Sequence, residues 1–231
     1  MNIVICDDDE VSRNQIEEVC KELGEINGCD IISCASGEEL LEMNLSEVKL
    51  LVLDVEMEGA SGIEVKNRLE ENGEIAIIFL TSHSERMKDA FGKNVFGFLK
   101  KPIELESFKE IVRRIDNVQR LNKKISINLC TGEIKIIKIS DIMYIEANGH
   151  YVWFQCGHKK EFVDYGMIYW ENVLDSTIFV KVDRSHIVNM YHFFLKENRL
   201  LSKTGTIIDV PRRKKDVIKQ KMLEFAINYT K

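Results

Sequence analysis

Residues 50–54 read Leu-Leu-Val-Leu-Asp, four apolar side chains followed by a carboxylate, and this stretch decides the fold of the first half of the chain. A run that is apolar at every position indicates a strand buried on both faces, which is typical of a parallel sheet covered by helices. Similar β-branched or apolar runs lie at residues 3–6, 30–34, 75–80 and 97–99. Because burial of an unpaired charge is unfavourable, Asp54 needs a partner and is the first candidate for a functional residue.

Helical patterns separate these strands. Apolar residues at positions 16, 19, 20 and 23 recur at the spacing of one helix face, and a later stripe predicts a helix from about Glu104 to Leu121. The pairs Ser36/Glu39 and Ser61/Glu64 match the S-x-x-E capping box that begins a helix. Strands that alternate with helices predict a doubly wound α/β domain, with five parallel strands in the order 2-1-3-4-5.

Polar residues follow the predicted strands at their carboxyl ends, where ligands of such sheets bind. We expect the carboxylates of Asp7, Asp8 and Asp54 to meet there with the hydroxyl of Thr81 and the ammonium of Lys101. Close carboxylates require a cation, and oxygen ligands suit Mg²⁺. A carboxylate can attack phosphorus while a metal and an ammonium neutralise the phosphoryl oxygens. The pattern therefore predicts a phosphoryl-accepting aspartate.

Each of these signals also has a plainer interpretation. Residues 7–9 could only cap the first helix, Thr81-Ser82 could cap another, and Lys101-Pro102 could be a solvated turn. Their coincidence at four expected strand ends favours the functional interpretation.

The first 120 residues resemble the receiver domain of two-component response regulators. The matching motifs are Ile-Cys-Asp-Asp-Asp (5–9), Leu-Val-Leu-Asp-Val-Glu-Met (51–57), Phe-Leu-Thr-Ser (79–82) and Phe-Leu-Lys-Lys-Pro (98–102). The resemblance implies that Asp54 accepts a phosphoryl group from a sensor histidine kinase. It implies that Thr81 then moves onto the phosphoryl oxygens and that Phe98 turns inward.

The resemblance also implies a set of binding residues. Mg²⁺ would be held by Asp7, Asp8, Asp54 and the main-chain carbonyl of Glu56. Lys101 would contact the phosphate and precede a cis peptide bond to Pro102. One departure is Glu58, which stands where many receivers have proline and alters the loop beside Asp54.

The second half of the chain changes to short strands and turns. Asn148-Gly149 is the strongest hairpin signal, and other turns are expected at Thr131-Gly132, Gly157-His158 and Thr204-Gly205. A helix is predicted near Met167–Leu174, and a terminal helix includes Ile218, Met222 and Phe225. The predicted strands are 125–129, 134–139, 142–145, 151–156, 161–163, 179–182, 187–190, 199–201 and 207–210.

Basic residues occupy particular loops of this β-rich half. The run Arg212-Arg213-Lys214-Lys215 follows Pro211, Arg184 precedes a strand, and His150 lies at a hairpin turn. Arginines on a rigid scaffold suit phosphates and guanine edges. The alternative is an ordinary solvated helix start for the basic run and a surface residue for His150.

This half resembles the LytTR type of DNA-binding domain, over roughly residues 125–225. The matching segments are Ile142–Ala147, His150–Val152, Phe179–Asn189 and Ile207–Arg213. The resemblance implies an elongated set of antiparallel sheets whose loops enter DNA grooves, with contacts from His150, Arg184, Arg212 and Arg213. Two departures are Asp183, which could divert the Arg184 guanidinium, and Pro211, which replaces a usual serine.

The formal charge of -6 conceals two different halves. Residues 1–120 hold 26 acidic and 14 basic residues, whereas residues 121–231 hold 12 acidic and 18 basic residues, so the net charges are -12 and +6. This division predicts two domains, residues 1–121 and 122–231.

Composition sets the class of protein. With 45% hydrophobic and 30% charged residues, the chain is typical of folded soluble proteins. No apolar run approaches the roughly 20 residues of a membrane span, and the N-terminus lacks signal-peptide features. The six cysteines show no CxxC spacing, so we expect buried, reduced thiols in a cytoplasmic protein and no zinc site.

Together these features predict a cytoplasmic transcriptional response regulator that binds double-stranded promoter DNA. Phosphorylation of Asp54 would change the receiver face formed by its fourth and fifth helices and favour a homodimer on paired half-sites. Beyond self-catalysed phosphorylation and slow dephosphorylation, we expect no enzymatic function.

Two alternatives remain open. The β domain could bind protein rather than DNA, against which Arg184 and the basic run at residues 212–215 argue. The first domain could be a Mg²⁺-dependent phosphohydrolase, against which the position of Asp54 outside any Asp-x-Asp pair argues.

Overall fold

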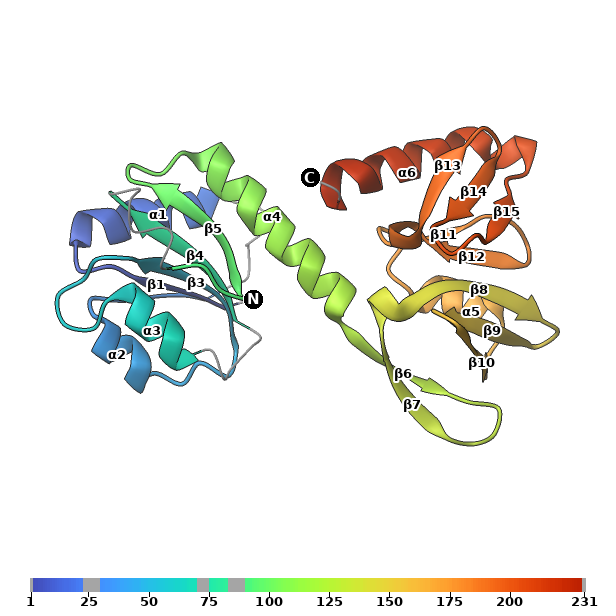
Figure 1. The fold of residues 1–231 in the computed structure, drawn as a ribbon, viewed down its shortest axis with the longest axis horizontal. Coiled ribbons are helices and arrows are strands. Elements are labelled where there is room, and N and C mark those ends of the chain that lie inside the picture. The colour runs from blue at the N-terminus through green and yellow to red at the C-terminus, as the bar shows by residue number, and fades with distance from the viewer. Residues whose placement is uncertain (1, 23–29, 70–74, 83–89, 230–231) are drawn as a thin grey trace. The chain divides into compact units, whose positions relative to one another are not determined.

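The computed structural model of the chain describes residues 2–22, 30–69, 75–82 and 90–229 (Figure 1). It divides into two compact units, residues 1–115 and 116–231, and each unit has hydrophobic clusters of its own. The division falls within helix α4 (Leu105–Asn122), and the predicted boundary at residues 121 and 122 lies at the end of that helix. No described helix combines the length and the apolar character that a membrane span requires.

The first unit contains a parallel sheet with strand order β2-β1-β3-β4-β5, which confirms the predicted topology. The central strands lack an alternating pattern because both of their faces are covered, and every residue of β4 is buried. The strands are β1 (Asn2–Cys6), β2 (Ile31–Cys34), β3 (Val48–Asp54), β4 (Ala76–Thr81) and β5 (Val95–Lys100).

Helices cover both faces of this sheet. Helix α1 (Glu10–Glu22) and α4 contribute Ile16 and Phe108 to the cluster on one face. Helices α2 (Gly37–Glu42) and α3 (Gly62–Leu69) contribute Leu40 and Val65 to the cluster on the other.

The two predicted capping boxes form at the starts of α2 and α3. The Glu39 N–H donates to the Ser36 hydroxyl oxygen at 3.2 Å, and the Glu64 N–H donates to that of Ser61 at 3.4 Å. The Glu64 carboxylate accepts in return from the Ser61 N–H. These local signals therefore set the starts of both helices.

The second unit is mainly antiparallel, as predicted. Its largest sheet has the order β10-β9-β8-β12-β11, and smaller sheets have the orders β13-β14-β15 and β6-β7. The strands are β6 (Lys124–Asn128), β7 (Ile134–Lys138), β8 (Ile142–Asn148), β9 (Tyr151–Cys156), β10 (Lys159–Val163), β11 (Phe179–Lys181), β12 (His186–Asn189), β13 (Phe193–Lys196), β14 (Arg199–Ser202) and β15 (Ile207–Asp209). The helices are α5 (Met167–Val173) and α6 (Lys215–Tyr229).

Strand β12 of the five-stranded sheet is packed on both of its faces. Ile187 packs in a cluster with Trp170 of α5, whereas the next residue, Val188, packs in a cluster with Leu200 of β14 and Phe225 of α6. Successive side chains of a strand point to opposite faces, so a single strand contributes to both clusters.

Two expectations about this unit were incomplete or wrong. Strand β13 was not predicted, because it directly follows a 3₁₀ turn at Met190–His192 and alternates only briefly. Cys130 is exposed and Cys156 is half-buried, rather than buried, although Cys6, Cys20 and Cys34 are buried free thiols as expected. Cys29 lies outside the described residues.

Gly62 begins α3 directly against the end of β3. A Cβ atom at this position would lie 2.1 Å from the carbonyl oxygen of Asp54. The Gly62 N–H donates to the Val55 carbonyl at 3.2 Å, which holds the helix start on the strand end. Close approach, and not an unusual backbone angle, therefore requires glycine here.

We expect Gly62→Ala to destabilise the first unit by about 1–3 kcal/mol, because the added methyl group forces α3 away from Asp54. Hydrogen exchange of the β3 amides in the full chain, followed by mass spectrometry, measures the change. Arg68→Ala, at an exposed position of the same helix, is the control and leaves exchange nearly unchanged. Equal exchange in the two variants would contradict the role of Gly62.

Candidate functional site

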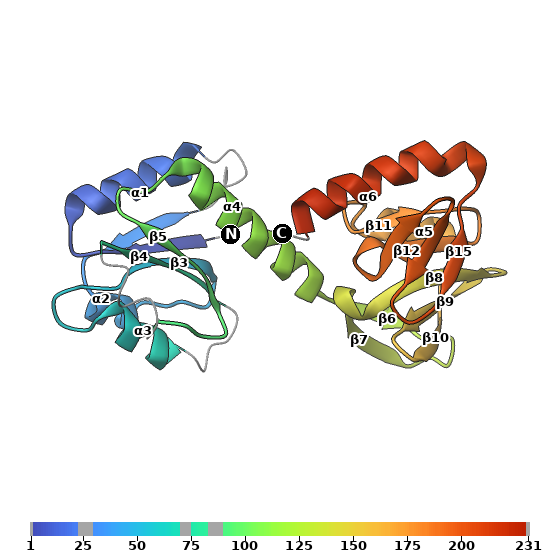
Figure 2. The same ribbon diagram turned by 45° about the horizontal axis from the view of Figure 1, so that its top comes forward.

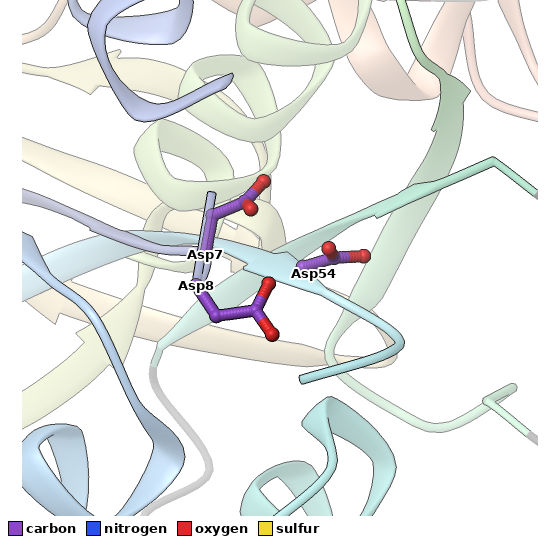
Figure 3. A group of neighbouring side chains, drawn as sticks. All are labelled: Asp7, Asp8 and Asp54. Atoms are coloured by element: carbon purple, nitrogen blue, oxygen red, sulfur yellow. The ribbon is translucent and has the colours of Figure 1, made fainter. Parts of the chain in front are cut away.

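Three carboxylates meet at the carboxyl end of the first sheet. Asp7 and Asp8 follow β1, and Asp54 ends β3, the neighbouring strand. One oxygen from each lies within 4.8 Å of the others, and Figure 3 shows the side chains leaving the strand ends toward the same side. Asp7 and Asp54 are buried, whereas Asp8 is exposed. The structure thus brings together the carboxylates that the sequence predicts.

The Lys101 ammonium lies between the two buried carboxylates. Its Nζ atom is 2.6 Å from Oδ2 of Asp7 and 2.6 Å from Oδ2 of Asp54. The lysine follows β5, and its main-chain N–H donates to the Thr81 carbonyl at 3.2 Å. The peptide bond between Lys101 and Pro102 is cis, as expected.

Burial and ion pairing oppose each other at this site. Burial raises the pKa of Asp54, although the hydrogen bond and charge of Lys101 counteract the rise. Burial alone would lower the pKa of Lys101, but the bonds to Asp54 and Asp7 outweigh it, and the pKa of Lys101 is raised. The lysine is therefore charged at neutral pH, and its pairing with Asp54 favours the ionised carboxylate.

The donors present fit a hard divalent cation. One ammonium does not balance three carboxylates, and all the side-chain donors are oxygens. The loop after Asp54 is turned toward the cluster, because the Glu56 N–H donates to Oδ1 of Asp54 at 3.3 Å. Asp7, Asp8, Asp54 and the Glu56 carbonyl are the candidate Mg²⁺ ligands.

Thr81 and Phe98, the predicted switch residues, lie on neighbouring strands. Thr81 is buried at the end of β4. The half-buried Phe98 ring on β5 stacks on Phe79 with centroids 5.7 Å apart and meets the exposed Phe91 ring edge-on at 5.1 Å. The fourth receiver helix, expected after Ser82, falls in residues 83–89, outside the described residues.

A contact from Arg13 to the acidic cluster was not predicted. The Arg13 guanidinium on α1 donates to the main-chain carbonyl of Asp7. Its place in the first turn of the helix that follows Asp7 is a weak signal, because many helices carry a basic residue there. Arg13 supports the backbone of the site and leaves the Asp7 carboxylate to Lys101.

The predicted DNA-contacting residues of the second unit lie on turns at one end of it. The Ala147 N–H donates to the Ser185 carbonyl at 2.8 Å, which places the Arg184 turn beside the β8–β9 turn that carries His150. The Lys214 ammonium donates to the Lys181 carbonyl at 3.0 Å, which places the turn at 212–214 beside the end of β11. Figures 1 and 2 both show these turns at the same end of the unit.

We call this surface, formed by His150, Arg184, Arg212 and Arg213, the basic end. All four residues are exposed. Within the part of the chain that the structure describes, the side chains of the three arginines make no hydrogen bond or ion pair. Ion pairs with carboxylates instead engage Arg120, Lys135, Lys160, Lys181 and Arg199. The basic end therefore presents positive charge that the fold does not neutralise.

Asp183 holds the Arg184 turn and does not divert its guanidinium. Its Oδ1 atom accepts from the Ser185 N–H at 2.6 Å and from the His186 N–H at 2.8 Å, and its carboxylate contacts the His186 ring. Burial alone would raise the pKa of Asp183, but these hydrogen bonds outweigh it and the pKa is lowered. Its stabilising effect is therefore present above about pH 4 and is lost as the pH falls through the lower folded pKa.

Comparison with known proteins assigns a family to each unit. The sequence-family model of the response regulator receiver domain matches residues 3–115, and the sequence-family model of the LytTr DNA-binding domain matches residues 132–222.

Relatives from several bacteria match across both units. The sensory transduction protein LytR of Staphylococcus haemolyticus is 25% identical over 222 residues, covering 83% of this chain and 85% of that protein. The positive alginate biosynthesis regulatory protein of Pseudomonas aeruginosa is 25% identical over 209 residues, covering 81% and 82%. The transcriptional regulatory protein LytR of Staphylococcus aureus is 25% identical over 212 residues, covering 83% and 84%.

The Asp183 carboxylate has two opposite effects on DNA binding: its charge repels DNA, and its hydrogen bonds hold the turn that carries Arg184. Removal of a negative charge beside Arg184 would by itself strengthen DNA binding. We expect Asp183→Ala to weaken it instead, because the turn loses its hydrogen-bond acceptor and no longer holds Arg184 in place. Fluorescence anisotropy with DNA selected by the wild-type chain measures the affinity, and hydrogen exchange at Ser185 and His186 measures the turn.

Asp183→Asn is the matched control, since its amide oxygen can still accept both main-chain N–H bonds. It should bind DNA at least as tightly as the wild type. Tighter binding by Asp183→Ala would show that the carboxylate only repels DNA.

Proposed function

We propose that this chain, which belongs to the LytTR family of two-component response regulators, is switched by phosphorylation of Asp54. Its receiver domain and its LytTR DNA-binding domain make it a DNA-binding transcriptional response regulator. One observation carries the assignment of Asp54: the Lys101 ammonium lies 2.6 Å from carboxylate oxygens of both Asp7 and Asp54. This arrangement places a cation where a transferred phosphoryl group would carry its charge.

In the proposed reaction, a carboxylate oxygen of Asp54 attacks the phosphorus of a phosphohistidine on a sensor histidine kinase. The phosphorus–nitrogen bond breaks, an acyl phosphate forms on Asp54, and the histidine leaves as a neutral imidazole after taking up a proton. Lys101 stays charged and binds the transferred oxygens. Mg²⁺ held by Asp7, Asp8, Asp54 and the Glu56 carbonyl supplies further neutralisation of the phosphoryl charge when it is bound.

The switch then passes through Thr81 and Phe98. The Thr81 hydroxyl moves onto the phosphoryl oxygens, and the Phe98 ring follows it inward. Phe98 supports this role because its ring is only half-buried, with Phe79 on one side and the exposed Phe91 on the other. Slow self-catalysed dephosphorylation of Asp54 resets the receiver.

The basic end is the proposed DNA-contacting surface. His150, Arg184, Arg212 and Arg213 lie on neighbouring turns, and the three arginines have no carboxylate partner within the described ranges. Guanidinium groups in this state can bind phosphates and read guanine edges. Their common position and the LytTR match favour promoter DNA over a protein partner.

Phosphorylation is proposed to promote a homodimer on paired half-sites in the cytoplasm. Joining two DNA-binding units raises the effective concentration of the second unit once the first is bound. A moderate change in receiver association is thereby converted into a large change in promoter occupancy.

Acetyl phosphate with Mg²⁺ is expected to add one phosphoryl group to the wild-type chain. Asp54→Asn should accept none, because the amide lacks the nucleophilic carboxylate oxygen. Intact-mass spectrometry reads the result directly, and Asp9→Asn serves as a control acidic residue of the same loop that keeps wild-type labelling. Labelling of Asp54→Asn at the wild-type level would refute the assignment.

DNA binding is expected to fall at least tenfold in the double variant Arg184→Ala/Arg212→Ala, and the log–log salt slope should decrease by roughly 2, since two phosphate contacts are lost. Band shifts at several salt concentrations measure both quantities. Lys203→Ala is the control, because this exposed lysine lies in the β14–β15 turn, at the opposite end of that sheet from Arg212. Equal losses in both variants would mean that the effect is one of net charge alone.

A further inference from the structure

The main-chain N–H of Glu58 contacts the acidic cluster of the receiver. It donates to Oδ2 of Asp8 at 3.1 Å, across 50 residues of sequence. Asp8 is the exposed carboxylate of the cluster, whereas Asp7 and Asp54 are buried and bound by Lys101. The carboxylate with the least packing around it thus has a main-chain donor that limits its rotation.

The loop that carries this donor is held by contacts that do not involve Glu58. The Val55 N–H donates to the Leu80 carbonyl at 3.0 Å, which ties the start of the loop to β4. The Ala60 N–H donates to Oε1 of Glu38 at 2.8 Å, which ties the end of the loop to α2. The loop therefore presents the Glu58 N–H from a fixed position, whereas the exposed Asp8 side chain has little packing to hold it.

We propose that the Glu58 main-chain N–H is a positioning group for the Mg²⁺ site. It binds one oxygen of Asp8 and leaves the other directed at the cation. A hydrogen bond to an ionised carboxylate is roughly twice as strong as one between neutral groups, so it can hold even an exposed side chain. The inference rests on the proposed function of the first unit as a Mg²⁺-dependent phosphoryl acceptor, and it deepens that proposal.

The identity of residue 58 decides whether this donor exists. Proline has no main-chain N–H, so the receivers that carry proline here lack the bond. The Glu58 carboxylate plays no part in the proposal, which depends on the backbone alone. Alanine and proline at position 58 therefore distinguish the effect of the carboxylate from that of the main-chain N–H. Both substitutions remove the carboxylate, and only proline removes the N–H donor.

The test is the Mg²⁺ affinity of the full chain, measured by isothermal titration calorimetry with MgCl₂. We expect Glu58→Ala to keep the wild-type Kd within about twofold, and Glu58→Pro to weaken it by about threefold to tenfold, since a charge-assisted hydrogen bond is lost. Equal Kd values for the two variants would overturn the positioning role while leaving the proposed function intact. No Mg²⁺ binding by the wild type would instead refute the function itself.

A second measurement tests the bond without proline and so does not depend on how that variant folds. In amide NMR spectra, Asp8→Ala should shift the Glu58 resonance upfield, because its N–H loses a charged acceptor. The Ala60 resonance, whose acceptor is Glu38, is the internal control and should move little. A Glu58 resonance that does not move would overturn the inference.

Discussion

The ammonium of Lys101, bonded to carboxylates of Asp7 and Asp54, is the interaction on which the first unit depends. Both carboxylates adjoin strands whose side chains are apolar and buried, so the edge of the sheet closes around them only when their charge is compensated. The same burial that raises the pKa of Asp54 also keeps water from competing at its oxygens. The ion pair with Lys101 favours the ionised form of Asp54 and counteracts the effect of burial. The folding of the first unit and the phosphoryl transfer proposed for Asp54 therefore depend on the same ion cluster.

In the second unit, the positions of the basic residues indicate a binding surface more clearly than the net charge does. Much of the positive charge is neutralised within the fold, as in the pair between Lys160 and Glu146. Arg184, Arg212 and Arg213 are exposed and have no such partner among the described residues. The same turns are held by hydrogen bonds with the main chain, such as those that the Asp183 carboxylate accepts from two main-chain N–H groups. On this surface, the residues that hold the turns are thus distinct from the exposed arginines that are proposed to contact DNA.

The sequence predicted best what is encoded locally or by strand order. The capping boxes at Ser36 and Ser61 form, and apolar runs that end in aspartate correctly indicated a parallel sheet with an acidic edge. Contacts between a side chain and a distant main-chain group were not predictable, because any residue type offers an N–H; the bond from Glu58 to Asp8 is one example. The expectation that Asp183 could divert the Arg184 guanidinium was wrong for a related reason. The sequence shows the charge of Asp183 but not the turn whose main-chain N–H groups it binds.

Neighbouring side chains of the basic run at residues 212–215 differ in whether they contact the protein or face solvent. The Lys214 ammonium donates a hydrogen bond to the Lys181 carbonyl, whereas Arg212 and Arg213 remain exposed. Lys214 thus stabilises the turn, and the two arginines do not take part in that contact. Under the proposed DNA contacts, substitutions at the two arginines would change promoter preference without loosening the turn that Lys214 holds. The proposed recognition residues and the contact that holds their turn are therefore separate side chains, so one can be replaced while the other is kept.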